Sequence, residues 1–330
     1  MPNGMISVAL ATYNGEPYLR AQLDSIFSQS YSELEVVAVD DGSTDATVAI
    51  LEEYAAKYPL EIHRNAENLG FVRNFEKAVS LCRGDFVALA DQDDIWYPQK
   101  LERLRPLLDD NLLVYSDADL IDEHGASLGT TLRDLYGGLR FVRGSHPRSF
   151  LLAECVSGNT MVMRRELLDH ALPIPDGVPY HDIWISFVAS ARGTIDYVDS
   201  SLLQYRRHTE SITVDQAARE SEDTPRNWFR KRARAVTRLQ TMAACPSLRP
   251  NDRRFVDRLA ALAGGFRRRW FSVALFWLVW RSGGELFATR TRPRVLPRAL
   301  FHARGYRLHR WKLRLALKRR LTFWRRPRSL

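Results

Sequence analysis

The strongest constraint on how this chain can fold is an alternation of strand-like and helix-like segments over residues 6–91. Short apolar runs, typical of buried strands, alternate with segments whose apolar side chains recur at helical spacing. The expected strands cover residues 6–11, 34–39, 60–63 and 85–90, and the expected helices cover residues 18–29, 46–57 and 71–82. This order predicts an α/β fold in which helices cover both faces of a mostly parallel sheet.

Polar turns follow three of the expected strands, at residues 12–15, 40–45 and 91–94. Ligands of open α/β sheets bind beyond the carboxyl ends of the strands, so these turns should line one crevice. The second turn also has a purely structural interpretation, because Gly42 could supply a positive φ and Asp45 could cap the next helix.

The carboxylates of these turns are the candidate ligand groups. Asp40 and Asp41 could accept hydrogen bonds from a nucleotide base or a ribose hydroxyl. Asp91, Asp93 and Asp94 lie within four residues, and a hard divalent cation such as Mg²⁺ would offset their mutual repulsion. The alternative is a solvated acidic turn that caps the following helix.

Four motifs in this order resemble those of family 2 glycosyltransferases, which have the GT-A (Rossmann-like) fold. They are Ala11-Thr12-Tyr13-Asn14-Gly15, Asp40-Asp41-Gly42-Ser43-Thr44-Asp45, Asn68-Leu69-Gly70 and Asp91-Gln92-Asp93-Asp94-Ile95-Trp96. The resemblance covers about residues 5–215 and implies an inverting transferase that uses a nucleotide-diphosphate sugar and Mg²⁺ or Mn²⁺. The chain lacks both the glycine-rich dinucleotide fingerprint after its first strand and a P-loop.

The resemblance implies a role for each matched position. The donor would be held by Ala11, Thr12, Tyr13, Asp41, Asp91 and Gly158, and the metal by Asp93 and His208. Asp182 matches the catalytic base, where the family usually has a Glu-Asp pair whose first member is here His181. The sequence His181-Asp182-Ile183-Trp184, with the Asp-Gln-Asp-Asp-Ile-Trp motif, is similar to the rhamnosyltransferase branch and implies dTDP-L-rhamnose as the donor.

Three of these positions also have structural interpretations. Asp182 could be only a helix N-cap, His208 could be a hydrogen-bonded structural residue, and the loop around Gly158 could be a bulge. In this part of the chain, we expect strands at residues 112–117 and 156–163 and a further strand that ends at residues 205–208. A helix should follow residue 180 and continue through residue 191. Residues 125–150 should form a loop-rich basic segment near the acceptor.

Inverting transfer requires fewer protein groups than glycoside hydrolysis, which needs two carboxyl groups. A nucleotide diphosphate leaves as an anion, so a metal can replace the general acid and one base suffices. The alternatives are a non-catalytic nucleotide-sugar-binding protein or a nucleotidyltransferase of similar fold. The presence of Asp41, Asp91, Asp93 and Asp182 argues against the first, and a first loop that is not rich in Gly and Arg argues against the second.

Charge divides the chain near Thr224. Residues 1–224 carry 19 Lys and Arg against 36 Asp and Glu, a net charge of −17, whereas residues 225–330 carry 29 against 3, a net charge of +26. So sharp a break indicates a functional boundary. We therefore expect a catalytic domain over residues 1–224 and a basic, aromatic-rich helical region over residues 225–330.

The basic region contains an 11-residue apolar run, residues 270–280, between arginines. A bilayer-spanning helix needs about 20 apolar residues, whereas tryptophans at both ends and flanking arginines suit a helix in the headgroup region. We expect this region to bind an anionic membrane surface rather than nucleic acid, which the acidic half would repel. The alternative is an ordinary buried helix with a solvated basic tail.

Three widely spaced cysteines, Cys82, Cys155 and Cys245, provide neither a disulfide framework nor a metal site, which favours a reducing compartment. The first residues lack the pattern of a signal peptide. The combined expectation is a cytoplasmic enzyme, peripherally associated with the inner face of the plasma membrane, which adds a sugar to a lipid-linked, cell-surface polysaccharide.

Overall fold

The computed structural model describes residues 4–135, 139–152, 155–208, 224–288, 295–305 and 307. The strands are β1 Ile6–Thr12, β2 Leu34–Asp40, β3 Leu60–Arg64, β4 Phe86–Asp91, β5 Ile95–Trp96, β6 Leu113–Ile121, β7 Ser127–Thr131, β8 Met161–Arg164 and β9 Ile195–Arg206. The helices are α1 Glu16–Phe27, α2 Thr47–Ala55, α3 Phe71–Leu81, α4 Lys100–Leu104, α5 Leu132–Leu135, α6 Leu168–Ala171, α7 His181–Arg192, α9 Pro225–Ala243, α10 Pro250–Gly264, α11 Val273–Arg281, α12 Gly283–Leu286 and α13 Val295–Ala303.

The nine strands of the described residues belong to one sheet, in the order β3-β2-β1-β4-β8-β6-β9-β5, with β7 beside β6. The first four strands are parallel, as predicted, and β8 lies antiparallel between β4 and β6. Because β6 is antiparallel to β8 and parallel to β9, it runs in the same direction as β1. The carboxyl ends of β1, β2, β4, β6 and β9 therefore share one edge of the sheet.

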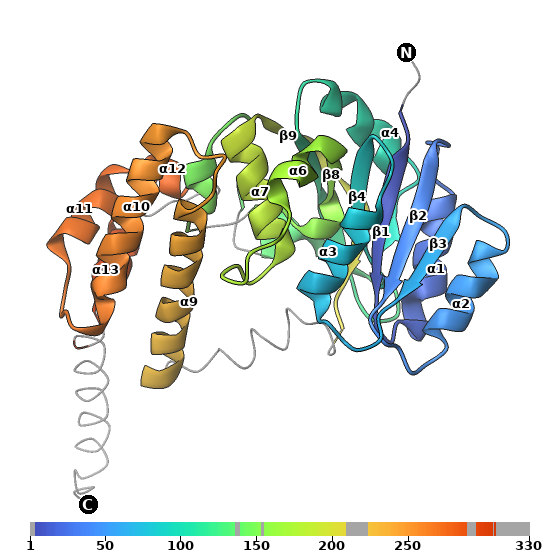
Figure 1. Ribbon diagram of the computed structural model, residues 1–330, viewed down its shortest axis with the longest axis horizontal. Helices are drawn as coiled ribbons and strands as arrows, with labels where there is room; N and C mark the ends of the chain where they lie inside the picture. The colour runs from blue at the N-terminus through green and yellow to red at the C-terminus, as the bar shows by residue number, and fades with distance from the viewer. Residues whose placement is uncertain are drawn as a thin grey trace, which may run out of the picture.

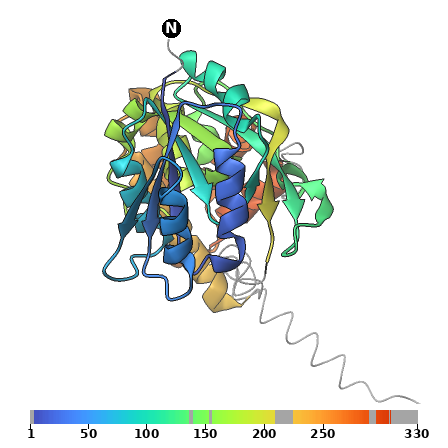
Figure 2. The ribbon, with the colours of Figure 1, turned by 90° about the vertical axis from the view of Figure 1, so that its right-hand side faces the viewer.

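Side-chain alternation along the strands gives the sheet two apolar faces. Val8 and Leu10 of β1 point to the face covered by α1, α2 and α4, whereas Ala9 points to the face covered by α3 and α7. Helices thus lie on both faces, as the alternating sequence pattern predicts (Figure 2).

The helices of the basic region pack against the α3 and α7 side of the sheet. Buried residues of α9, α10 and α11, including Leu239, Leu259 and Val279, belong to the same apolar cluster as Phe187 of α7. Figure 1 shows these helices beyond α7, at the end of the molecule farthest from β3. Helix α9 begins at Pro225, next to the expected boundary, and Thr224 Oγ1 accepts a hydrogen bond from the Asn227 amide at 3.1 Å.

Two local expectations need correction. The strand expected over residues 156–163 begins only at Met161, because residues 158–160 form a 3₁₀ turn in which the Thr160 hydroxyl donates to the Ser157 carbonyl. The segment expected to be loop-rich, residues 125–150, contains β7, α5 and a 3₁₀ helix at Pro147–Phe150. The three cysteines are buried and form no disulfide.

Candidate active site

The three polar turns meet at the carboxyl edge of the sheet, as predicted. The Asp41 amide donates to the Thr12 carbonyl at 2.8 Å, and the Tyr13 amide donates to Gln92 Oε1 at 2.8 Å. The Asn14 amide donates to the Ser43 hydroxyl at 2.9 Å. These contacts join the ends of β1, β2 and β4 into one floor, with the ring of Tyr13 half exposed above it.

Asp40 and Asp41, at the end of β2, were expected to bind a ligand, and they also hold neighbouring turns together by hydrogen bonds. Asp40 is fully buried and accepts hydrogen bonds from Thr12, Gly42 and Ser43 of the adjoining turns. Gly42 has φ of 86°, which confirms the conformation expected of that glycine.

Asp41 is also buried. Its Oδ1 accepts from Asn65 Nδ2 at 2.7 Å and from the Leu69 amide at 2.8 Å, and its Oδ2 accepts from the Gly70 amide at 2.9 Å. Asp41 thus fastens the loop that precedes α3 to the floor of the site. Both oxygens already accept protein hydrogen bonds, so contact with a base or ribose would use their remaining lone pairs.

The acidic turn after β4 contains one carboxylate that is wholly internal. Asp94 is 0% exposed and accepts from the Arg206 amide at 3.1 Å and from Asn159 Nδ2. Lys100, also 0% exposed, donates to the Asn159 carbonyl at 2.6 Å and lies 3.4 Å above the Trp96 ring. Burial, with repulsion from Asp93 and Asp91, raises the pKa of Asp94. Burial lowers the pKa of Lys100, and the negative charges of Asp94 and Asp91 act against that shift.

Asp91 and Asp93 are the partly buried carboxylates of this turn. Burial, with repulsion from Asp93 and Asp182, raises the pKa of Asp91 to about 7. Asp93 Oδ2 lies 2.8 Å from His208 Nε2, and the Arg206 guanidinium donates to the Asp93 carbonyl at 2.8 Å. The structure therefore brings together Asp93 and His208, which are 115 residues apart in the sequence.

Asp182 lies in the first turn of α7 and does not cap it. The helix begins after Tyr180 with no side-chain cap. Asp182 Oδ1 accepts from the Ile183 amide at 2.7 Å, and Asp182 Oδ2 accepts from the Gly158 amide at 3.2 Å. The charge of Asp182 also acts on Asp91, where it contributes to the raised pKa of that carboxyl. The Gly158 loop and the start of α7 thus form one side of the site.

His181 lies behind Asp182, away from solvent. Its ring stacks on Phe75 with a centroid distance of 4.1 Å, and neither ring nitrogen has a hydrogen-bond partner among the described residues. A Cβ atom at Gly158 would lie 2.8 Å from His181 Nε2, so the histidine ring fills the space that the glycine leaves. Burial lowers the pKa of His181 to about 3.

The residues that the sequence analysis did not identify are Lys100, Asn159 and Arg206, which surround Asp94. The sequence contains a signal for Lys100. Three clustered carboxylates require a positive charge nearby, and Lys100 is the first basic residue after them. Neither Asn159 nor Arg206 gave a comparable signal, because their contacts depend on chain segments that are distant in sequence.

The residues Asp93 and His208 fit a divalent cation as a pair. Among the described residues, no group of three or more His, Cys, Asp or Glu side chains could hold a metal ion. Mg²⁺ and Mn²⁺ sites of phosphate-handling enzymes commonly use one or two protein ligands and complete their shells with water and substrate phosphates. One carboxylate and one imidazole that face each other at 2.8 Å match that ligand set.

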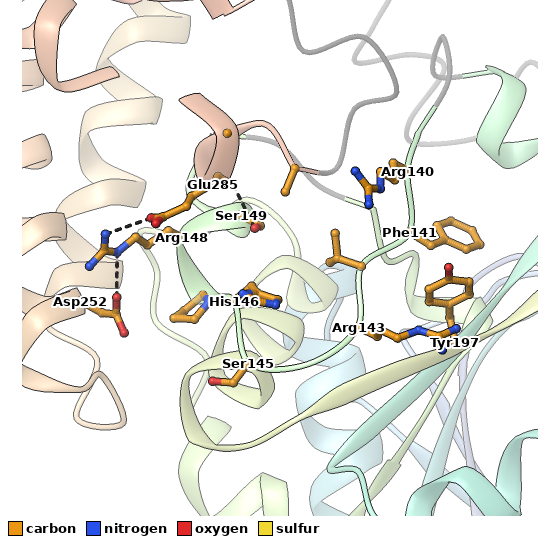
Figure 3. A pocket seen from close by; sticks show the side chains of 14 residues that line it. Arg140, Phe141, Arg143, Ser145, His146, Arg148, Ser149, Tyr197, Asp252 and Glu285 are labelled. Carbon is orange, nitrogen blue, oxygen red and sulfur yellow. Dashed lines mark hydrogen bonds and ion pairs between the residues drawn. The ribbon is translucent and has the colours of Figure 1, made fainter. Parts of the chain in front are cut away.

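A separate cavity lies between residues 140–149 and helices α10 and α12. It has a volume of about 600 Å³, and its lining includes Arg140, Arg143, Arg148 and Tyr197 (Figure 3). Tyr197 is near the amino end of β9, whereas Arg206 at its carboxyl end adjoins Asp93. This cavity is therefore separate from the acidic site, and two acids, Asp252 and Glu285, neutralise Arg148 within it.

The fold is an α/β sheet with polar turns at its carboxyl edge, and the comparison with known families shows which class of protein has it. The profile of glycosyl transferase family 2 matches residues 7–171, and the chain belongs to this family. The sheet and its flanking helices form a GT-A-like fold, as the resemblance implied.

Relatives support the family assignment. An uncharacterised protein of Mycobacterium tuberculosis is 30% identical over 219 residues, which cover 63% of this chain and 60% of that protein. An uncharacterised glycosyltransferase of Haemophilus influenzae is 28% identical over 219 residues, which cover 62% of this chain and 66% of that protein. The chain therefore spans less than two thirds of the length of these relatives.

Two solved structures show the same fold. Staphylococcus aureus TarS, residues 1–349, in complex with UDP-GlcNAc, aligns with a TM-score of 0.57 at 18% identity, over 93% of this chain and 89% of that one. The mannosyltransferase PcManGT of Pyrobaculum calidifontis, in complex with GDP-Man and Mn²⁺, aligns with a TM-score of 0.55 at 19% identity, over 91% and 74% of the two chains.

Proposed function

We propose that this protein is an inverting glycosyltransferase, which moves a sugar from a nucleotide-diphosphate donor to a hydroxyl group of a growing, lipid-linked, cell-surface polysaccharide. The observation that carries the proposal is the meeting of Asp93 and His208 opposite Asp182, around Asp91, at the carboxyl edge of the sheet. In a family 2 chain, this arrangement supports Asp93 and His208 as the groups for the diphosphate and Asp182 as the group for the acceptor.

The donor would lie along the floor formed by the first three turns. Its nucleotide would contact Ala11, Thr12, Tyr13 and Asp41, and its ribose and sugar would approach Asp91 and Gly158. Supporting this placement, the ring of Tyr13 is 48% exposed and can stack on a base, whereas Thr12 and Asp41 are buried and shape the floor beneath it.

The diphosphate end of the donor would be held where Asp93 and His208 converge. Mg²⁺ or Mn²⁺, when bound by these two residues, supplies positive charge to the departing diphosphate. Asp93 and His208 orient that end of the donor, and the Arg206 guanidinium holds the Asp93 carbonyl and so fixes the backbone of the turn. The complex of PcManGT with GDP-Man and Mn²⁺ is a precedent among proteins of this fold.

Transfer would then be a single displacement at the anomeric carbon. As the acceptor oxygen attacks this carbon, Asp182 takes the hydroxyl proton, and the bond from the carbon to the diphosphate oxygen breaks with inversion. The proton stays on the Asp182 carboxyl, and the nucleotide diphosphate leaves as the anion. The Gly158 amide, which donates to Asp182 Oδ2 at 3.2 Å, positions the base for this step.

For the donor sugar, the proposal is L-rhamnose from dTDP-L-rhamnose, which inversion would convert into an α-linked product. The support is the motif His181-Asp182-Ile183-Trp184 together with the Asp-Gln-Asp-Asp-Ile-Trp turn. His181 is buried against Phe75 and would not touch the sugar. Sugar selection would therefore depend on the loops around it.

A donor screen tests the proposal. The purified protein is incubated with dTDP-L-rhamnose, UDP-GlcNAc or GDP-mannose, with an acceptor extract, and with Mg²⁺, Mn²⁺ or excess EDTA. Release of nucleotide diphosphate with one donor, lost in EDTA, is expected. In a parallel incubation with a nucleoside triphosphate and a sugar 1-phosphate, release of pyrophosphate would indicate a nucleotidyltransferase. Donor binding without turnover would indicate a binding protein. Faster turnover of UDP-GlcNAc than of dTDP-L-rhamnose would exclude the rhamnose assignment.

The Asp93→Asn variant tests the metal assignment. Loss of one ligand charge should reduce turnover by a factor of about 10² or more, while the fold is kept, because an amide oxygen binds a divalent cation far more weakly than a carboxylate does. The readouts are nucleotide diphosphate release and the affinity for Mn²⁺. Asp257→Asn, which changes an exposed carboxylate of α10, is the matched control. Near-normal turnover of Asp93→Asn would contradict the assignment.

The lipid-linked acceptor and a position on the inner face of the plasma membrane belong to the same proposal. No helix among the described residues is long and apolar enough to cross a membrane. The support for peripheral association is the charge of +26 on residues 225–330 together with the aromatic run at residues 270–280.

A further inference from the structure

Among the described residues, helices α11 and α13 and the segment just before α11 carry most of the exposed large apolar side chains. Of the twelve such side chains exposed among the described residues, seven lie between residues 270 and 301. They are Trp270, Val273, Trp277, Trp280, Leu296, Leu300 and Phe301, hereafter the α11–α13 face. Soluble monomers rarely expose so concentrated an apolar surface without a binding partner.

The two helices lie side by side and antiparallel. The Ser272 amide donates to the Ala303 carbonyl, and the Gly305 amide donates to the Trp270 carbonyl, each at 2.9 Å. Gly283 follows α11, and Val295 is the first residue of α13. These two residues lie so close together that an added Cβ on Gly283 would collide with the Val295 side chain. The start of α11 therefore adjoins the end of α13, and the end of α11 adjoins the start of α13.

Helix α11 is apolar on two sides. Leu275 and Val279 point inward and are buried in the same cluster as the core of α7. Val273, Trp277 and Trp280 recur at spacings of four and three residues, so they share another side, where Trp277 and Trp280 are 45% and 43% exposed. A helix that only packs on the core needs the first side alone, so the second has a different partner.

Exposed arginines lie at both ends of α11. Arg267, Arg268, Arg269 and Arg281 flank α11 and are exposed, and the Arg281 guanidinium lies 5.8 Å from the centre of the Trp277 ring. The sequence has a single acidic residue after Asp257, Glu285, and it pairs with Arg148. Aromatic rings flanked by arginines complement a surface that is apolar inside and negatively charged at its border.

We propose that the α11–α13 face docks on a bilayer containing anionic phospholipid, with both helices in the plane of the headgroups. Helix α11 has nine residues and is about 14 Å long, less than half of a hydrocarbon core. Tryptophan rings favour the headgroup depth, and the arginines would contact lipid phosphates. Figure 1 shows α11 and α13 at the end opposite β3, so the bound bilayer leaves the turns after β1 and β2 uncovered.

The docking face does not depend on the chemistry of the site, but its use in presenting a lipid-linked acceptor rests on the proposed function. The test therefore measures membrane binding and donor turnover separately. The full-length chain is sedimented with phosphatidylcholine vesicles and with vesicles that also contain phosphatidylglycerol. The variants are Trp277→Ala/Trp280→Ala and Arg268→Gln/Arg269→Gln, with Leu128→Ala/Leu135→Ala, exposed apolar residues outside the face, as the matched control.

The wild type and the leucine control should bind the anionic vesicles. The tryptophan pair should lower the partition coefficient about tenfold or more on both vesicle types, because buried apolar surface is lost. The arginine pair should lower the preference for anionic vesicles about tenfold. High salt should weaken binding by the wild type without abolishing it, and all four proteins should release nucleotide diphosphate at the same rate with a soluble acceptor analogue.

Three results would overturn the docking proposal. They are no binding of the wild type to either vesicle, unchanged binding of the tryptophan variant, and light scattering that shows a dimer in solution which the tryptophan changes dissociate. The last result would assign the face to a second copy of the chain. Vesicle binding without donor turnover would leave docking in place and instead contradict the proposed transferase function.

Discussion

At the scale of single residues, the site keeps several carboxylates together by giving each a different environment. Asp40 and Asp41 accept backbone and side-chain hydrogen bonds, and Asp94 is buried beside Lys100. Asp91 and Asp93, the other two carboxylates of this turn, are the proposed ligand groups, and the charge of Asp182 acts on Asp91. Lys100 supplies one positive charge from within the protein.

The Asp182→Asn variant should slow the chemical step by a factor of about 10²–10⁴, the usual contribution of a general base. The amide keeps an oxygen that can accept from the Gly158 amide, so the loop should stay in place. The measurements are single-turnover rates and nucleotide diphosphate affinity by calorimetry. Affinity lost in parallel with the rate would mean that Asp182 acts in donor binding or in structure.

His181 should make stability depend on pH. Its pKa is lowered from an ordinary value near 6.5 to about 3, so below pH 6.5 the unfolded chain takes up a proton that the folded chain does not. The free energy of unfolding should therefore fall, by about 1.4 kcal/mol per pH unit for this group, as the pH falls from about 6.5 toward 3.

The measurement is urea unfolding between pH 5 and pH 7.5 for the wild type and for His181→Gln. The variant should show a shallower loss of stability on acidification. His302 provides a comparison, because burial also lowers its pKa to about 3 and His302→Gln should flatten the profile in the same way. Parallel profiles for the wild type and His181→Gln would contradict the prediction.

At the scale of elements, the candidate site residues lie in loops, and the strands and helices hold these loops in position. The turns after β1, β2 and β4 are tied together by Tyr13, Gln92 and Asp41, and the start of α7 is tied to the 3₁₀ turn at Gly158–Thr160. That turn replaces the expected beginning of a strand. It sets the Gly158 amide at Asp182 while Asn159 reaches Asp94.

Gly158→Ala should disturb both connections. The new Cβ would lie 2.8 Å from Nε2 of the buried His181 ring, so the turn or the ring must shift. Overpacking of this kind costs about 1–3 kcal/mol of stability, and turnover should fall as Asp182 loses its donor. Gly284→Ala, where a Cβ meets no atom within 4 Å, is the control and should change little.

The side chain responsible can be identified with a second substitution. Replacing His181 by the smaller Asn should relieve the contact, so Gly158→Ala should cost less in that background than in the wild type. Chemical denaturation of the four proteins in this cycle gives the coupling free energy. Equal costs in both backgrounds would show that His181 is not the obstacle.

At the scale of the whole molecule, a sharp boundary in charge does not coincide with a break in the core. The helices after Thr224 share one apolar cluster with α3 and α7. Arg148, from the segment before that boundary, pairs with Asp252 at 2.7 Å and with Glu285 at 2.9 Å. These are two of the three acids in residues 225–330. The basic region is thus anchored to the rest of the molecule by apolar packing and by its few negative charges.

Arg148→Met should loosen this junction. It leaves Asp252, whose side chain is 19% exposed, without its cation, and such a loss costs about 1–3 kcal/mol when the pair is partly buried. Arg143→Met, which removes a pair with Asp196 from a side chain 62% exposed, is the control and should cost less than about 1 kcal/mol. Hydrogen exchange should show faster exchange in α10 and α12 for Arg148→Met alone.

The sequence by itself determined the elements and most of their order. Strand and helix periodicity is local, so the parallel strands, the helices between them and the position of the polar turns follow from neighbouring residues. The resemblance to a known family added the expectation that Asp93 and His208 would meet. The charge boundary and the aromatic run at residues 270–280 could also be identified from the sequence alone.

Only the tertiary structure decided which polar groups are buried and which remain open. Burial depends on neighbours that are distant in the chain: Lys100 is enclosed by the Asn159 turn, His181 by Phe75 and Gly158, and Asp94 by the end of β9. The same holds for α11, whose apolar run has one side in the core and another on the surface only because α10 and α13 cover part of it. Periodicity shows that a side chain is apolar or charged, but the free energy of desolvation depends on what finally surrounds it.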